Sequence, residues 1–149
     1  MQINKYLNIA SRYLSISLAV SYLWFVADRL GLIGKNGTAH VSWGDWQHFI
    51  IYARQTMHFL PHAYVPFFAV VATLCEATIG ILLLLGLFTH TASIGSGILS
   101  LLFALSMALS FGIESPIAYS VFTVSAASFV LACLPVNKYS LDLWRLKNI

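Results

Sequence analysis

The chain has 149 residues, of which 59% are hydrophobic and only 9% are charged. Soluble globular domains carry about 25% charged residues, so this composition excludes an ordinary soluble domain and indicates a protein of the lipid bilayer. The net charge of +3 does not call for a nucleic-acid partner. The sequence also contains no nucleotide-binding motif, phosphate-binding loop or nucleophile elbow.

Four apolar runs are long enough to form helices that span a hydrocarbon core about 30 Å thick, which takes roughly 20 residues. We place them at residues 7–27, 63–88, 91–113 and 116–135. They predict an all-α membrane protein, a four-helix transmembrane bundle that forms a single domain over residues 1–149. The first run is too long for the apolar part of a signal peptide and lacks a small-x-small cleavage site, so we expect an uncleaved first span.

The segment between the first two runs predicts an additional helix at the membrane surface. The Ser-Trp-Gly-Asp sequence at 42–45 fits a capping box, and apolar residues then recur at intervals of three and four. This pattern indicates an amphipathic interfacial helix over about residues 44–60, in the first extracytoplasmic loop. Trp43 and Trp46 are typical of a membrane interface. We expect this helix to lie over the outer mouth of the bundle.

The basic residues predict the orientation of the chain in the membrane. Five of the eight lie near the two termini: Lys5, Arg12, Lys138, Arg145 and Lys147. Basic residues are enriched on the cytoplasmic side, and an even number of spans brings both termini to one face. We therefore expect both termini in the cytoplasm and the long segment 28–62 outside it.

Glu76 lies near the middle of the second apolar run, where no water solvates a carboxylate. A charge at that depth costs about 2.5–3.5 kcal/mol by translocon-based estimates, so the residue needs a partner or a proton and marks a functional site by default. Its helical face carries small or weakly polar residues: Ala69, Ala72, Thr73 and Gly80. Glu76 is therefore expected to point into the bundle, with Arg12 of the first run as its electrostatic partner, directly or through water.

The third and fourth runs carry small residues at helical spacing, which lets helices approach closely in lipid. Those of the third run are Ser93, Gly97, Ser100, Ala104 and Ala108, and those of the fourth are Ser120, Thr123, Ala127 and Ala132. We interpret both stripes as faces that pack against other helices.

A quinone site is one interpretation of Glu76. Such a site needs an apolar pocket, aromatic walls, and a protonatable or hydrogen-bonding group at the ring oxygens. The candidate catalytic residues are Glu76 and Arg12, and the candidate ligand-binding residues are Arg54, His58, Trp43 and Trp46. The alternative is that Glu76 is protonated or paired and only holds the helices together.

Other cofactors are not expected. Four of the five histidines fall in the outer segment: His40, His48, His58 and His62. Their spacing fits no metal signature, so we expect solvated interfacial histidines and no metal site. Haem is not expected because no span holds a histidine in its interior. Cys75 and Cys133 lie in different runs without a CxxC pair, which argues against thiol–disulfide chemistry.

One sequence pattern resembles a known family. It consists of Arg12 in the first run and the stretch from Glu76 to Thr89, which reads E-A-T-I-G-I-L-L-L-L-G-L-F-T. The DoxX family of four-helix bacterial membrane proteins shows an arginine early in its first helix and E-x-x-x-G-x-x-L-x-x-G-L-x-T in its second. The positions that match are Arg12, Glu76, Gly80, Gly86 and Thr89. The chain differs at His90, where the family usually has a basic residue.

The resemblance implies a multi-pass protein of the bacterial cytoplasmic (inner) membrane. It implies an accessory membrane subunit of a quinone-linked redox system, with quinone or quinol as its ligand and other membrane redox subunits as partners. The alternative is a non-catalytic membrane scaffold, a small-molecule carrier or a metal-handling accessory protein.

Overall fold

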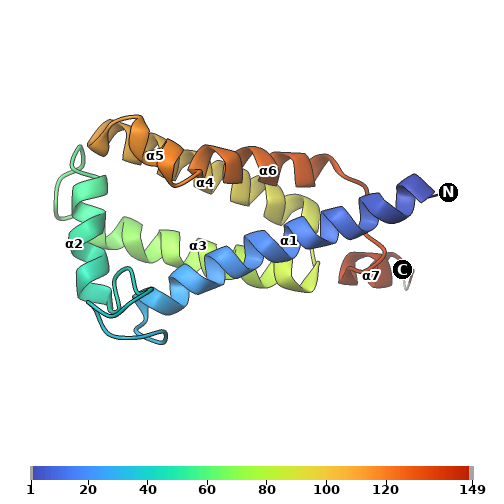
Figure 1. The fold of residues 1–149 in the computed structure, drawn as a ribbon, viewed down its shortest axis with the longest axis horizontal. Coiled ribbons are helices and arrows are strands. Elements are labelled where there is room, and N and C mark those ends of the chain that lie inside the picture. Colours follow the sequence, from blue (N-terminus) through green and yellow to red (C-terminus); the bar gives the residue numbers. More distant parts are fainter. Residues whose placement is uncertain (1, 148–149) are drawn as a thin grey trace.

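The computed structural model describes residues 2–147, and this part of the chain forms seven helices and no strands (Figure 1). The helices are α1 (Gln2–Arg29), α2 (Trp46–Thr56), α3 (Val65–Leu85), α4 (Thr89–Phe111), α5 (Glu114–Ala118), α6 (Val121–Cys133) and α7 (Leu141–Lys147). The expected all-α class is therefore confirmed.

Three helices are long and apolar enough to cross a membrane: Lys5–Arg29 within α1, all of α3 and all of α4. Each presents large exposed apolar side chains on the face turned away from the other helices, for example Phe67, Leu74 and Leu102. Such a surface suits lipid, whose tails are as apolar as leucine. These three helices indicate a membrane protein.

The fourth apolar run does not form one continuous helix as expected. It divides between α5 and α6, and Ser120 between them adopts the left-handed conformation with a φ of 56°. The 13 residues of α6 extend about 20 Å at 1.5 Å per residue, less than the hydrocarbon core of about 30 Å. The expected single helix over 116–135 is thus wrong, and a helix–turn–helix takes its place.

The long helices pack as two pairs, α1 along α3 and α4 along α6, and α3 and α4 join the pairs. Figure 1 shows α2 lying across one end of this bundle, with α7 and the start of α1 at the other. We call these the α2 end and the terminal end. Polar residues that are distant in the sequence meet at both ends. Asp28 and Arg29 toward the α2 end are buried, whereas the terminal end contains a cavity.

The helix predicted in the first long loop is present as α2, and it covers Trp46–Thr56 rather than about 44–60. The Asp45 carboxylate caps it by accepting a hydrogen bond from the backbone N–H of His48 at 2.9 Å. Its apolar face, which includes the buried Phe49, packs against the start of α3. Beyond Thr56 the backbone forms turns instead of continuing the helix to residue 60.

The small residues of α4 face other helices, as expected. The buried ones are Ser93, Gly97, Ser100 and Ala104. A Cβ added at Gly97 would meet the ring of Phe129 on α6 at 2.8 Å, so the two helices touch at this point. On α6 the predicted face is only partly right: Ala132 is buried as expected, but Ser120 and Thr123 are exposed, and Ser125 and Ser128 are buried instead.

The turn between α3 and α4 is tight and is held by α7. Gly86 and Phe88 adopt left-handed conformations, with φ of 66° and 49°. The Asp142 carboxylate accepts hydrogen bonds from the backbone N–H of Phe88 at 2.6 Å and of Thr89 at 2.8 Å. The backbone N–H of Asp142 donates to the Gly86 carbonyl at 3.0 Å. A Cβ at Gly86 would meet Ser140 at 2.7 Å. Both the left-handed backbone and this close contact therefore require glycine at position 86.

A methyl group added on the α4–α6 interface should destabilise the bundle. We expect Gly97→Ala to lower the free energy of unfolding by about 1–3 kcal/mol, because the new Cβ overlaps the Phe129 ring. Gly95→Ala on the same helix is the matched control, since its Cβ would lie 3.6 Å from Ile79 in ordinary contact. Thermal unfolding of both variants in detergent measures the difference. Equal melting temperatures would contradict the close α4–α6 contact.

The cap of α2 should depend on pH. Backbone and side-chain hydrogen bonds from His48 lower the pKa of Asp45. A carboxyl group with a lowered folded pKa contributes stability above its unfolded pKa of about 3.9 and loses that contribution as pH falls through the folded value. Hydrogen-exchange protection in the first turn of α2 should therefore be full at about pH 6 and decline below about pH 4. Asp45→Asn keeps an acceptor without a titrating group, so its protection should not change over this range.

Candidate functional site

Glu76 lies in the interior of the bundle, on the face of α3 that the sequence predicted. Its relative exposure is 3%. Thr73 and Gly80 on the same face are also buried. A Cβ at Gly80 would meet the Leu23 side chain of α1 at 2.9 Å, so α1 and α3 approach closely just beside Glu76. The close approach leaves Glu76 surrounded by protein rather than by lipid.

The partner of Glu76 is Arg29, the last residue of α1. Nη1 of Arg29 donates to Oε2 of Glu76, and Nη2 donates to Oε1 at 3.2 Å. Nη1 also donates to Oγ1 of Thr73 at 3.1 Å. The two side chains are only 6% and 4% exposed. This two-pronged pairing of a guanidinium with a carboxylate is the geometry in which arginine binds carboxylates most strongly.

The direction of helical side chains explains how Arg29 reaches Glu76. The Cα–Cβ bonds of a helix tilt toward its N-terminus, so a long side chain at the end of α1 extends back along the helix. Because α1 and α3 lie alongside each other in opposite directions, this brings the guanidinium to Thr73 and Glu76 in the middle of α3. From the sequence, Arg29 is expected in the loop after the first span and not as the partner of Glu76. The available signal was that Arg29 comes directly after the first apolar run, so that its side chain can extend back along that helix toward Glu76.

Arg12 is not the partner of Glu76, and that prediction is wrong. Its guanidinium donates from Nη1 to the carbonyl of Leu83 at 3.1 Å and from Nη2 to the carbonyl of Leu84. These carbonyls belong to the last turn of α3, where carbonyl groups lack the regular helical partner four residues on; the Leu83 carbonyl also accepts from the backbone N–H of Gly86 at 3.3 Å and from the Ser15 hydroxyl at 2.7 Å. They lie about two turns beyond Glu76, toward the terminal end. Arg12 therefore caps α3.

Two aromatic rings cover the guanidinium of Arg29. Its Cζ lies 5.1 Å from the ring centroid of Trp43 and 4.1 Å from that of Phe49, within the range of cation–π contacts. The two rings meet edge to face with centroids 5.2 Å apart. Of the residues predicted to bind a ligand, Trp43 therefore contacts the ion pair. Trp46 packs on the Phe49 ring at 5.4 Å, one ring further away.

Asp28 holds the segment that carries Trp43. Its relative exposure is 1%. Its carboxylate accepts three consecutive backbone N–H groups, from Ser42 at 3.0 Å, Trp43 at 3.1 Å and Gly44 at 3.1 Å. Neighbouring residues at the end of α1 therefore act on two different parts of the chain. Asp28 fastens the outer segment and Arg29 fastens α3.

Arg54 and His58 do not approach Glu76. Arg54 is exposed on α2. Nδ1 of His58 lies 2.9 Å from the hydroxyl of Ser110 on α4, so His58 ties the segment after α2 to that helix. Nδ1 of His48 lies 2.8 Å from the Asp45 carboxylate. Within residues 2–147, no three residues of the His, Cys, Asp and Glu types gather closely enough to hold a metal ion.

A chain of buried hydroxyl groups crosses the middle of the bundle. The Tyr22 hydroxyl lies 2.8 Å from Oγ of Ser96 and 2.7 Å from Oγ of Ser100. Ser96 in turn lies 2.7 Å from Oγ of Ser128 on α6. Sequence analysis interpreted the α4 serines only as small residues. Their hydroxyls join α1, α4 and α6 by hydrogen bonds, which specify how these helices are aligned.

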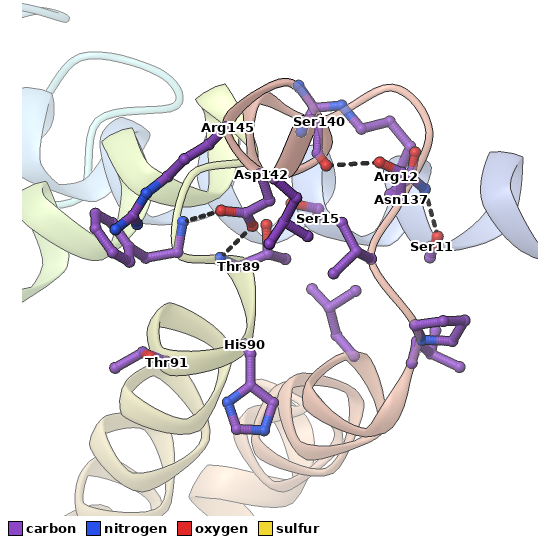
Figure 2. A pocket seen from close by; sticks show the side chains of 16 residues that line it. Ser11, Arg12, Ser15, Thr89, His90, Thr91, Asn137, Ser140, Asp142 and Arg145 are labelled. Atoms are coloured by element: carbon purple, nitrogen blue, oxygen red, sulfur yellow. Dashed lines mark hydrogen bonds between the residues drawn. The ribbon is translucent and has the colours of Figure 1, made fainter. Parts of the chain in front are cut away.

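A cavity of about 390 Å³ opens at the terminal end (Figure 2). Its walls come from the first half of α1, the start of α4, the end of α6 and the segment through α7. Arg12 and Thr89, two of the residues of the DoxX-like pattern, line it, whereas Glu76 does not. The DoxX-like positions are therefore divided between the interior of the bundle and its terminal end.

Comparison with known proteins found no matching family model, no matching curated protein and no matching solved structure. The functional interpretation therefore depends on the geometry of the two ends.

The buried ion pair should behave as a unit in mutational tests. Either Glu76→Leu or Arg29→Met alone leaves one buried charge without its partner, and each should reduce the free energy of unfolding by about 3–5 kcal/mol. The double variant should recover most of that loss, because both charges are then absent. Melting temperatures of the four proteins in detergent complete the cycle. If the two single losses simply add, the residues are not coupled.

Proposed function

We propose that this protein crosses the membrane four times, with α5 and α6 together forming the fourth crossing. Two observations support the proposal. In Figure 1, α5 and α6 follow one another along α4. They also carry exposed apolar side chains such as Ile117, Phe129 and Val130, as a lipid-facing element does. The aromatic residues around α2 favour an interfacial position for that helix, and the basic residues near the termini favour cytoplasmic termini. Four crossings are also what the DoxX resemblance implies.

Within this architecture we propose a non-catalytic accessory role, as a membrane scaffold or carrier. The observation that carries the proposal is the pairing of both Glu76 oxygens with the Arg29 guanidinium. A general base must direct a free acceptor at its substrate. Glu76 directs its acceptors at Arg29 instead, beneath the rings of Trp43 and Phe49. The pair joins α1 to α3 and, through Trp43, to the outer segment.

The second candidate is the quinone-linked role that the resemblance implies. The Nε atom of Arg29 favours it, because this donor is buried and has no hydrogen-bond partner within residues 2–147. A buried unsatisfied donor is costly and often indicates a ligand or water. A quinone ring oxygen accepts such a donor, and Trp43 and Phe49 would provide aromatic walls. In this case the oxygen would share Arg29 with Glu76.

Titration with a quinone analogue distinguishes the two roles. For a scaffold, wild-type protein in detergent should bind no analogue, and Glu76→Gln should only lower the melting temperature. For a quinone-linked subunit, the wild type should give a saturable isotherm that Glu76→Gln abolishes. Glu114→Gln, the same change at an exposed carboxylate on α5, should leave both measurements unchanged. Saturable binding lost only in Glu76→Gln would overturn the scaffold proposal.

A further inference from the structure

The cavity at the terminal end combines apolar walls with two arginines and a histidine. Its apolar lining includes Phe88, Leu131, Leu134 and Leu146. Arg12, His90 and Arg145 line the same space. A second hollow of about 240 Å³ shares Ser11, Pro135 and Val136 with it and adds Lys138. The two together form a hollow that is apolar in its walls and basic at its edges.

The positive charges here are only partly offset within the described chain, by the one carboxylate of Asp142. Neither Arg12 nor Arg145 forms an ion pair among residues 2–147. Asp142 lines the cavity, but each of its oxygens accepts a backbone N–H at the start of α4 (Figure 2). The Arg145 guanidinium lies over the Phe88 ring, with Cζ 4.5 Å from the centroid. Stacking engages the face of a guanidinium and leaves the N–H groups at its edge available.

Thr89 provides an independent sign of a missing acceptor. Its hydroxyl is buried and has no hydrogen-bond partner within residues 2–147, and the residue lines the cavity. Native proteins rarely leave a buried hydroxyl unpaired. An acceptor atom located in the cavity would satisfy it.

We propose that this cavity binds the phosphate headgroup of an anionic membrane lipid. Arg145 and the Thr89 hydroxyl donate to the phosphate, and Lys138 and Arg12 add positive charge. A lipid is the occupant, rather than a soluble anion, because the cavity lies at the ends of apolar helices and most of its wall is apolar. Basic pockets between the ends of transmembrane helices are a recurrent form of lipid headgroup site. The proposal does not depend on the role of Glu76.

Lipid binding to the full chain tests this site. Delipidated protein in neutral detergent is titrated with phosphatidylglycerol and, separately, with phosphatidylcholine of the same acyl chains, and native mass spectrometry counts bound lipid. We expect one phosphatidylglycerol molecule to bind tightly and phosphatidylcholine to bind markedly more weakly. Arg145→Gln should weaken phosphatidylglycerol binding about fivefold, the contribution of one basic residue at an anionic surface. Equal affinity for the two lipids would overturn the proposal.

Two variants separate headgroup contact from loss of structure. Thr89→Val removes the hydroxyl but keeps the side-chain volume, so it should weaken phosphatidylglycerol binding and leave the melting temperature unchanged. Arg54→Gln removes an exposed arginine at the α2 end and should not alter binding. An effect of Arg54→Gln equal to that of Arg145→Gln would show nonspecific attraction and overturn the site. Complete displacement of the lipid by millimolar glycerol phosphate would show a soluble-anion site and overturn the lipid assignment.

Discussion

The ion pair between Arg29 and Glu76 is the interaction on which the rest of the bundle depends. A carboxylate within an apolar helix has to be satisfied by protein, because lipid offers no hydrogen bonds. Arg29 satisfies it from the end of α1, which fixes how far α1 and α3 are displaced along each other. Arg12 makes the second attachment by capping the last turn of α3. Arg12 in the first half of α1 and Arg29 at its last residue thus hold α3 at two points, with the close contact at Gly80 between them.

The same requirement explains the polar interior of the α4–α6 pair. Ser96, Ser100 and Ser128 are small enough to let the helices touch, and their hydroxyls bond to Tyr22 and to one another. Small side chains allow helices to approach in lipid, and hydrogen bonds between them make one alignment preferable to others. Apolar packing alone would leave the helices free to slide along each other. The serines therefore contribute both the close approach and the alignment.

The sequence predicted the helices and their packing faces better than the partners of the charged residues. Apolar length placed α1, α3 and α4, and the periodic apolar residues after Asp45 placed α2, although Asp45 rather than Ser42 caps that helix. The face of Glu76 followed from helical spacing. Its partner did not, because Arg29 follows an apolar run and precedes a glycine-rich segment, which made it look like part of a loop. The break between α5 and α6 was also missed, since hydropathy is continuous through Ser120 and no glycine or proline stands at that position.

The contrast between the two ends bears on which residues act on other molecules. Toward the α2 end, Glu76 and Arg29 bond to each other and Asp28 bonds to three backbone N–H groups, so of these side chains only the buried Nε of Arg29 keeps a donor without a partner within residues 2–147. At the terminal end, Arg145 and Thr89 line a cavity, and within residues 2–147 Arg145 has no ion-pair partner and the buried Thr89 hydroxyl has no hydrogen-bond partner. Binding needs donors that are positioned and unoccupied, whereas a buried ion pair fixes the structure because it is occupied. The charge that is most conspicuous in the sequence is therefore best placed to hold the fold, and the less conspicuous terminal end is better placed to bind.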